Sequence, residues 1–281
     1  MTYLRKPDWL KTKLQSNAQF VHVNKIVKEH GLHTICSSGR CPNMSECWNK
    51  GTATFMILGE ICTRSCRFCN TKSGLPLLPD LNEPSKLAES IQLMNLHHAV
   101  ITSVDRDDLS DGGATHWAET IKMIKSRNPS TTLEVLIPDF DGKTNLIDLI
   151  IAEKPDIISH NLETVKRLSS TIRTKAKYET SLKVLGYISS NQVVAKTGIM
   201  LGLGETENEV LELMDDALAV GCSILTIGQY MQPSRQNIPV NEYITPEKFE
   251  EYKQVGLKKG FRIVESSPLV RSSYCAEKHV L

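Results

Sequence analysis

The sequence lacks long apolar runs and an excess of charge of either sign. No segment approaches the roughly 20 apolar residues that a membrane-spanning helix needs, so we expect no membrane association. The 33 lysine and arginine residues nearly balance the 32 aspartate and glutamate residues, which leaves a formal net charge of +1. Such a chain has no broad field to attract nucleic acid or anionic lipid, so we expect neither as a partner.

The N-terminal segment also lacks the features of a secretory signal. Met1 to Lys13 is polar, carries four basic side chains, and has neither an apolar stretch nor a small-residue cleavage site. We therefore expect a cytoplasmic protein, whose thiols stay reduced. Eight cysteines are present, and six of them lie between Cys36 and Cys69. Clustered cysteines in a reducing compartment indicate metal binding or catalysis before disulfide formation.

Short β-branched runs alternate with longer amphipathic stretches along the 281 residues. The runs predict six strands, at Thr54–Leu58, Ala99–Val104, Leu133–Ile137, Asp156–Ser159, Lys196–Leu201 and Ile224–Gly228. The stretches predict helices, at Pro84–Leu96, Ala114–Arg127, Thr144–Glu153, Tyr178–Ser190 and Glu207–Val220. A last helix is expected from Pro246 to about Lys259, with Thr245 as its N-cap. This alternation predicts a parallel α/β sheet, either open and doubly wound or closed into a complete or partial barrel.

Three cysteines follow the first predicted strand directly. Cys62, Cys66 and Cys69, the second triplet, stand in a C-x-x-x-C-x-x-C pattern on a strand-to-helix loop. Soft thiolate ligands select iron–sulfur clusters or zinc over hard cations. A structural zinc site uses four ligands and an electron-transfer cluster normally uses four cysteines, whereas this pattern supplies three. Three ligands leave one iron of a cluster open, as a catalytic metal requires.

A looser group of cysteines precedes the second triplet. Cys36, Cys41 and Cys47, the first triplet, stand in a C-x4-C-x5-C pattern, which by itself is a weaker signal. One shared four-ligand site would leave two thiolates unused, so two separate three-cysteine sites are favoured. The surrounding polar loop, with its glycine and proline, argues against cysteines that act only as small buried hydrophobes. Cys222 lies in an apolar run and is expected in the core, while Cys275 has no assigned role.

The two triplets together carry a resemblance to known families. The spacing of the second triplet, with Phe68 before its last cysteine, resembles the radical S-adenosylmethionine superfamily. The first triplet, followed by Trp48 and the segment 51–59, resembles the lipoyl synthase family. Further resembling segments follow in order at 101–108, 160–164, 198–205, 225–230 and 268–274, where the last contains Arg-Ser-Ser-Tyr. Small departures from the family pattern occur at Glu60, Asn70, Ser267 and Cys275.

The resemblance implies an α/β fold built on an incomplete six-stranded (β/α) barrel of the TIM type, with an extension at each end. We expect an N-terminal extension at 1–50 with the first triplet, the barrel at 51–260, and a C-terminal extension at 261–281 with Arg-Ser-Ser-Tyr. The resemblance also implies two [4Fe–4S] clusters and S-adenosylmethionine as co-substrate. The second triplet would bind the cluster that cleaves S-adenosylmethionine. The first triplet would bind the other cluster, with Ser273 as fourth ligand.

By the same resemblance, the activity would be that of a sulfurtransferase. Radical chemistry would insert two sulfur atoms, at the sixth and eighth carbons of an octanoyl group on a protein lysine, and the cluster of the first triplet would supply the sulfur. The partners would be octanoylated carrier domains (the 2-oxoacid dehydrogenase acyltransferase subunit and the glycine cleavage H protein), a low-potential electron donor and cluster-assembly proteins. The oxygen of Ser273 is a harder ligand than a thiolate, and we hypothesise that its iron is easier to lose.

Polar residues after the predicted strands are candidate contacts for S-adenosylmethionine. Thr102, Ser103 and Asp105 follow the second strand, while Asn161 and Glu163 follow the fourth, so all five face the side of the second triplet. The resemblance adds the backbone of Phe68 near the adenine, and a Gly-rich turn that opens the next helix adds Gly204 and Glu205.

Each of these residues also has a structural alternative. Loop or turn capping would explain the polar ones, including Ser272 and Ser273. The charges from Asp105 to Asp108 could form a solvated run. Arg271 could pair with a carboxylate or protect the cluster of the first triplet. Among whole-protein alternatives, another radical sulfur-inserting enzyme, such as biotin synthase or a methylthiotransferase, would not pair the first triplet with Arg-Ser-Ser-Tyr. A non-catalytic cluster or zinc protein is a further alternative, and no Gly-x-Ser-x-Gly elbow supports a hydrolase.

Overall fold

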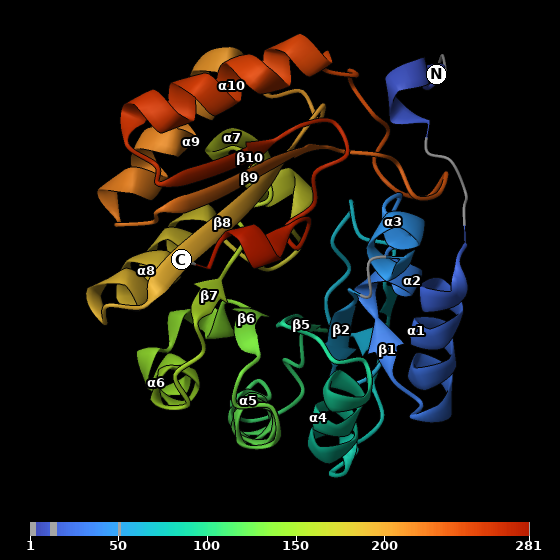
Figure 1. Ribbon diagram of the computed structural model, residues 1–281. Helices are drawn as coiled ribbons and strands as arrows, with labels where there is room; N and C mark the ends of the chain where they lie inside the picture. The colour runs from blue at the N-terminus through green and yellow to red at the C-terminus, as the bar shows by residue number, and fades with distance from the viewer. Residues whose placement is uncertain (1–3, 12–15, 50–51, 281) are drawn as a thin grey trace.

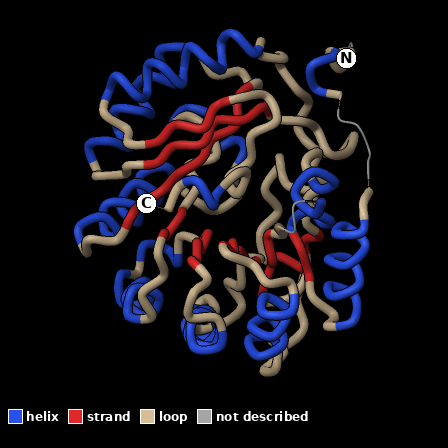
Figure 2. The backbone as a smooth tube through the Cα atoms, in the orientation of Figure 1, coloured by secondary structure: helices blue, strands red, loops and turns tan. Residues whose placement is uncertain are grey.

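The computed structural model describes residues 4–11, 16–49 and 52–280, and one curved sheet forms its centre (Figures 1 and 2). The sheet order is β1-β2-β5-β6-β7-β8-β9-β10. The strands are β1 His33–Thr34, β2 Thr54–Ile57, β5 His98–Ser103, β6 Thr132–Leu136, β7 Ile157–Ser159, β8 Val194–Leu201, β9 Ile224–Gln229 and β10 Ile263–Ser266. Neighbours from β2 to β10 are parallel, and β1 is antiparallel to β2. Over the described residues β1 does not pair with β10, so the barrel is incomplete, as the resemblance implied.

Helices connect the strands and surround the sheet (Figure 1). They are α1 Ala18–Glu29, α2 Ile35–Ser38, α3 Met44–Asn49, α4 Glu83–Leu93, α5 Ala114–Arg127, α6 Thr144–Ala152, α7 Lys166–Ile172, α8 Tyr178–Ser190, α9 Glu207–Ala219 and α10 Pro246–Lys259. Short 3-10 turns lie at Asp8–Leu10, Phe140–Gly142 and Ala276–Lys278, and a separate two-stranded sheet pairs β3 Ile61–Cys62 with β4 Lys72–Ser73. In the described part of the chain, no helix has the length and apolar character needed to cross a membrane.

Local sequence explains where two of the later helices begin and end. The hydroxyl of Thr206 caps α9 by accepting from the backbone N–H of Glu209, whose side chain in turn accepts from the N–H of Thr206. In α10, Thr245 is the N-cap, and a proline at the first position fits the fixed backbone angle. Gly260 ends α10 at φ 119°, a left-handed conformation that glycine adopts without strain. The predicted last helix is therefore confirmed.

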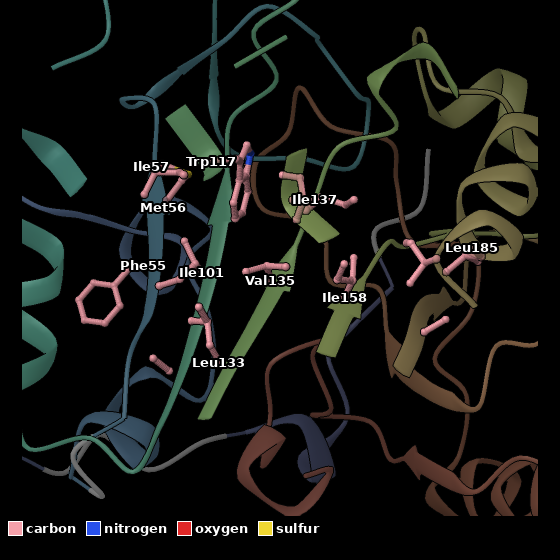
Figure 3. Close-up of a cluster of buried hydrophobic side chains, with 14 of the residues drawn as sticks. Phe55, Met56, Ile57, Ile101, Trp117, Leu133, Val135, Ile137, Ile158 and Leu185 are labelled. Atoms are coloured by element: carbon pink, nitrogen blue, oxygen red, sulfur yellow. The ribbon is translucent and has the colours of Figure 1, made fainter. Parts of the chain in front are cut away.

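Buried apolar side chains hold the strands against the helices (Figure 3). Phe55, Ile101, Val135 and Ile158 come from the consecutive strands β2, β5, β6 and β7, and Trp117 comes from α5; each is exposed by 1% or less. Burying each such side chain contributes about 1.5–3 kcal/mol relative to leaving it exposed. This packing fixes the carboxyl ends of the strands, which carry most of the predicted site residues.

All six predicted strands are present, with ends that differ by one or two residues from the prediction. Two strands of the main sheet were not predicted: β1 lies in the expected N-terminal extension and β10 in the expected C-terminal extension. The two strands of the separate sheet, β3 and β4, were not predicted either. The division at residues 50 and 260 stays a prediction, although β10 continues the parallel sheet. The helix predicted from Glu207 after the Gly-rich turn is confirmed, because α9 begins at Glu207. Cys222 is 1% exposed and lies in the core, as predicted.

The segment after β10 packs closely against the sheet. Gly228 in β9 allows the approach, because a Cβ atom there would lie 2.1 Å from the carbonyl oxygen of Val270. The backbone N–H of Gln229 donates to the carbonyl of Pro268 at 3.2 Å. The amide of Asn43 donates to the carbonyl of Leu269 at 2.6 Å. The C-terminal segment is therefore tied both to β9 and to the region of the first triplet.

A buried ion pair anchors the far end of the same segment. The ammonium of Lys196 in β8 donates to Glu134 in β6 at 2.7 Å, and to the Nδ1 atom of His279 at 3.1 Å. All three residues are fully buried. Because an unpaired buried charge is costly, this contact fixes His279 beneath the strands. Ser273 lies between the two attachment points.

Candidate active site

A cavity of about 690 Å³ opens at the carboxyl ends of the strands. It is lined by all three cysteines of the second triplet and by Cys36 and Cys41 of the first. The structure also brings the following predicted residues to its wall: Phe68, Thr102, Ser103, Asp105, Asn161, Glu163 and Ser273. A single cavity in contact with both triplets is the main geometric result of the fold.

The loop of the second triplet is held by one buried arginine. Arg64 lies between Cys62 and Cys66, and its side chain is 5% exposed. Its guanidinium donates to both oxygens of Asp107 at 2.9 Å and to Asp139 at 2.8 Å. Asp105 lies 3.3 Å from the same group. The planar guanidinium thus joins the cysteine loop to the segments after β5 and β6.

These contacts set the ionisation of the three carboxylates. Burial acts to raise the pKa of Asp107 and of Asp139, but the hydrogen bonds from Arg64, and for Asp107 also from Lys175, outweigh it and lower both pKa values. For Asp105 burial dominates, and it raises the pKa to about 6 although Arg64 acts against it. The carboxyl of Asp105 therefore sits at the cavity wall with weakened acidity.

The thiols of the second triplet lie in a setting that suits a bound cation. Burial and then the charge of Asp105 raise the pKa of Cys62 to about 12, and burial raises the pKa of Cys66. A coordinating metal reverses this preference and deprotonates the thiol. Backbone N–H groups already point at the sulfur of Cys62, from Arg64 at 3.4 Å and from Asp105 at 3.3 Å. Such donors stabilise negative charge on a thiolate.

The first triplet lies on two short helices beside β2. Cys36 is in α2, Cys47 is in α3, and Cys41 lies between them. Burial raises the pKa of all three thiols, and the neighbouring cysteines raise those of Cys36 and Cys47 further. The three thiols share a small cavity of about 30 Å³ with Ser273. The hydroxyl of Thr54 donates to the Ser273 oxygen at 2.7 Å, which holds that oxygen beside the cysteines.

Neither triplet forms a site for a single ion. Within the described residues, no three histidine, cysteine, aspartate or glutamate side chains converge on one metal position. In a four-iron cluster each protein ligand binds a different iron, so the ligands stand apart around the cluster. Three thiols on one loop with amide donors to sulfur fit such a cluster, and so do three thiols with one hydroxyl.

Several predicted S-adenosylmethionine contacts have polar atoms at the cavity wall. The amide nitrogen of Asn161 donates to Glu163 at 3.0 Å and to the hydroxyl of Ser272 at 2.9 Å. The amide oxygen of Asn161 is buried and accepts no hydrogen bond from the described residues. A buried acceptor without a donor is costly, and it fits a ligand that brings an N–H or O–H group. The Thr102 hydroxyl instead donates to Leu136, and Ser103 accepts from Trp117.

Two predicted residues do not line this cavity. The carboxylate of Glu205 accepts from the backbone N–H groups of Gly202 and Leu203, the latter at 2.9 Å. Gly204 has φ 103°, a conformation that favours glycine. These observations support the alternative role of shaping the turn before α9. A contact of either residue with S-adenosylmethionine stays a prediction.

Several charged residues that are buried at or near the site were not predicted from the sequence. The alternative of a solvated charge run is wrong for Arg106, which is 2% exposed and donates to the carbonyls of Leu58 and Leu77 as well as to Asp108. Glu134 also lines the cavity, although its strand reads as mostly apolar. Arg64 had one signal in the sequence, its place inside the cysteine pattern. Arg271 lines both cavities beside Cys41, and burial lowers its pKa.

Comparisons with known proteins give the family. Residues 56–217 match the sequence model of the Radical SAM superfamily, which implies S-adenosylmethionine and a [4Fe–4S] cluster as cofactors. The chain is 66% identical over 278 residues to the lipoyl synthase of Parabacteroides distasonis, covering 99% of both chains. It is 65% identical over 280 residues to that of Phocaeicola vulgatus, covering 100% of this chain and 99% of the relative.

Solved structures share the fold at low identity. SuiB of Streptococcus suis matches with a TM-score of 0.58 at 8% identity, over 84% of this chain and 56% of SuiB. The FeFe-hydrogenase maturase HydG from Carboxydothermus hydrogenoformans matches with a TM-score of 0.59 at 13% identity, over 93% of this chain and 68% of HydG. These likenesses support the partial barrel alone. Identity of about two thirds across nearly the full length of named relatives goes further, and this chain belongs to the lipoyl synthase family of sulfurtransferases within the radical SAM superfamily.

Proposed function

We propose that this chain inserts two sulfur atoms, at the sixth and eighth carbons of an octanoyl group carried on a protein lysine, and so makes the lipoyl cofactor. The observation that carries the proposal is the cavity of about 690 Å³ that both triplets line. Replacing an unactivated C–H bond by C–S needs a hydrogen acceptor and a sulfur donor that reach the same carbon. A shared cavity lets one acyl chain meet both.

In this proposal the second triplet binds a [4Fe–4S] cluster through Cys62, Cys66 and Cys69, with one iron open to S-adenosylmethionine. When bound, this pair supplies radical chemistry for hydrogen abstraction. The protein holds the loop rigid through Arg64, and the N–H groups near Cys62 stabilise the thiolate. The free amide oxygen of Asn161 accepts a hydrogen bond from S-adenosylmethionine. Thr102, Ser103, Asp105, Glu163 and the backbone of Phe68 complete the proposed binding wall.

The first triplet and Ser273 bind a second, auxiliary [4Fe–4S] cluster, which supplies the sulfur. Their shared cavity and the contact from Thr54 support this assignment. Ser273 would give this cluster an oxygen ligand that is harder than a thiolate and would hold its iron less firmly. The C-terminal segment carries Ser273 and is anchored on either side of it, so the fourth ligand is positioned before substrate arrives.

The rest of the cavity wall suits an alkyl chain. Apolar side chains line it from several strands and from the C-terminal segment, namely Met56, Val100, Leu136, Ile199 and Val270. Such a wall excludes water from the reacting carbons and places few polar groups near them. The volume lies within the range of about 300–1,000 Å³ that is usual for small-molecule sites.

The remaining partners follow from the proposed reaction. The substrate is an octanoylated carrier protein, and the preferred forms are the acyltransferase subunit of 2-oxoacid dehydrogenases and the H protein of glycine cleavage. A low-potential electron donor would reduce the cluster of Cys62, Cys66 and Cys69. Cluster-assembly proteins would rebuild the auxiliary cluster of the first triplet. The cytoplasm is the proposed compartment, because reduced thiols are required for both clusters.

A direct assay tests the proposal. The protein, reconstituted without oxygen, is given S-adenosylmethionine, reductant and an octanoyl-lysyl peptide, and the peptide is examined by mass spectrometry. We expect two sulfur atoms for two hydrogens in the product, and two molecules of S-adenosylmethionine consumed for each. Cleavage of S-adenosylmethionine with every octanoyl-lysine left unchanged, on both peptide and carrier protein, would contradict the proposal.

A further inference from the structure

The charged groups that line the large cavity differ in their exposure. The acidic ones are Asp105, Glu134 and Glu163, and none of them is exposed. Arg64 pairs with Asp105, Lys196 pairs with Glu134, and Asn161 donates to Glu163. The exposed charges are different. Among the described residues that line the cavity, every exposed charged side chain is basic, and these are Lys6, Arg40 and Arg235.

These three residues, the basic rim, come from segments far apart in the sequence. Lys6 belongs to the N-terminal segment, Arg40 lies between α2 and α3, and Arg235 lies in the loop between β9 and α10. Arg40 donates to the carbonyl of Pro233 at 3.1 Å, which joins its segment to the loop of Arg235. Over the described ranges, no carboxylate lies within ion-pair distance of any of the three. Their charges are therefore available to a partner.

The small reactants give no reason for this rim. S-adenosylmethionine carries a sulfonium and an ammonium group against one carboxylate, so a basic entrance repels it weakly. An octanoyl chain is uncharged. Neither Lys6 nor Arg235 forms a side-chain hydrogen bond or an ion pair with the described residues, so no such contact accounts for their positions. The rim therefore suits a charged partner that remains outside the cavity while its acyl chain enters.

We propose that the basic rim docks an acidic face of the carrier protein that presents the octanoyl-lysine. The inference rests on the proposed function, which requires a protein-bound acyl chain to enter this cavity. Exposed complementary charges act mainly on association, because they guide the encounter over about one Debye length and are screened by salt. The rim thus selects acidic carrier domains and aligns the lysine with the entrance.

The test compares two substrates and two charge-reversed proteins. The rim variant is Lys6→Glu with Arg235→Glu, while Arg40 is kept because it holds Pro233. The control variant is Lys177→Glu with Lys183→Glu, two exposed lysines at the start and in the middle of α8 that do not line the cavity. Both variants change the net charge equally. The substrates are an octanoylated carrier domain and a short uncharged octanoyl-lysyl peptide.

We expect the rim variant to raise KM for the carrier domain by about tenfold at low salt, and the control variant by less than about twofold. The difference should shrink at ionic strengths above about 0.15 M. For the uncharged peptide, kcat/KM should agree within about twofold for all three proteins. If the rim and control variants share one KM for the carrier domain, the inference is overturned.

Two further outcomes separate the inference from related ideas. Free octanoate serves as a competitor in the peptide assay, because it carries its own carboxylate. If it inhibits the native chain and not the rim variant, the rim recognises a small carboxylate and the proposed protein surface is wrong. If the native chain converts neither substrate, the failure belongs to the proposed function, since the rim is irrelevant to the uncharged peptide.

Discussion

The two cysteine triplets differ in how the chain closes around them. The second triplet lies on one loop and faces the large cavity. The first triplet lies on two short helices, and the C-terminal segment brings Ser273 to the same small cavity. Catalytic metal sites keep an open position, whereas closed sites use all their protein ligands. The proposed function accounts for this difference, because the open region of the second triplet would bind S-adenosylmethionine and the closed region of the first triplet would hold the sulfur to be inserted.

The two regions are also held in place by different means. Arg64 fixes the open loop through three carboxylates, so its support is electrostatic and local. The closed region depends on the C-terminal segment, which is attached at β9 and again through His279. A change in either support should affect one triplet and spare the other. The predictions below follow from this separation.

The largest expected effect comes from removing each triplet in turn. Replacing Cys62, Cys66 and Cys69 by alanine should abolish both the cleavage of S-adenosylmethionine and the insertion of sulfur. Replacing the first triplet by alanine should abolish insertion alone, because the cavity and the second triplet remain. Release of methionine and formation of lipoyl product are measured side by side. Loss of cleavage in both variants would show that the triplets do not act separately.

The next effect concerns Arg64. Replacing it by methionine removes the cation that Asp105, Asp107 and Asp139 share and leaves only Lys175 paired with Asp107, so the open loop should lose its shape. We expect bound iron to fall by about half and methionine release to disappear, with circular dichroism unchanged. Arg127→Met removes an exposed arginine near Glu89 and serves as control. Full iron content in the Arg64 variant would contradict the role assigned to this residue.

Replacing Ser273 by cysteine should affect the closed region only. A thiolate is a softer ligand that binds iron more firmly, so we expect sulfur insertion to fall several-fold while cleavage of S-adenosylmethionine continues. The rates are measured from methionine and lipoyl product in the same reaction. If the cysteine variant inserts sulfur at the full rate, lability of the fourth iron is not the reason for serine.

The ion pair of Lys196 and Glu134, which anchors the C-terminal segment, should contribute to the free energy of unfolding. Lys196→Met leaves Glu134 buried without a partner, which should lower the free energy of unfolding by about 3–5 kcal/mol. Adding Glu134→Met should recover most of the loss, because the uncompensated charge is gone. Urea denaturation of the cluster-free protein measures both. A double variant no more stable than the single one would show that the ion pair does not explain the loss.

The smallest effect acts on both regions alike through buried histidines. Burial lowers the pKa of His98 and His160 to about 4, below the ordinary value of 6.5. The unfolded chain therefore binds more protons between these pH values, so stability is full above pH 6.5 and falls toward pH 4. Each histidine contributes a slope of about 1.4 kcal/mol per pH unit. His160→Asn should reduce the slope of unfolding free energy against pH by that amount, and an unchanged slope would contradict it.

The sequence alone predicted the six central strands, and there are physical reasons why other strands were missed. Strands such as Val194–Leu201 are apolar along most of their length, and this pattern is visible without a structure. β1 and β10 were missed because they are short and lie outside the regular alternation. The start of α9 at Glu207 was predicted, and Thr206 before it is the capping residue.

In the candidate site too, some features could be predicted from the sequence and others could not. Cysteine spacing identified both triplets, because the three cysteines of each triplet lie close together in the chain. The network around Arg64 could not be read in this way, as Asp139 lies 75 residues away. The run from Asp105 to Asp108 looked solvated, yet Arg106 is buried because it satisfies two backbone carbonyls. Charges whose partners are distant in sequence are visible only in the fold.

The central claim is that the two triplets bind two separate clusters. Its most direct test is the iron and acid-labile sulfide content of the native chain after purification and reconstitution without oxygen. We predict about eight of each per chain, falling to about four when either triplet is replaced by alanine. About four of each in the native chain, unchanged by loss of the first triplet, would contradict the account and leave Cys36, Cys41 and Cys47 without a cluster.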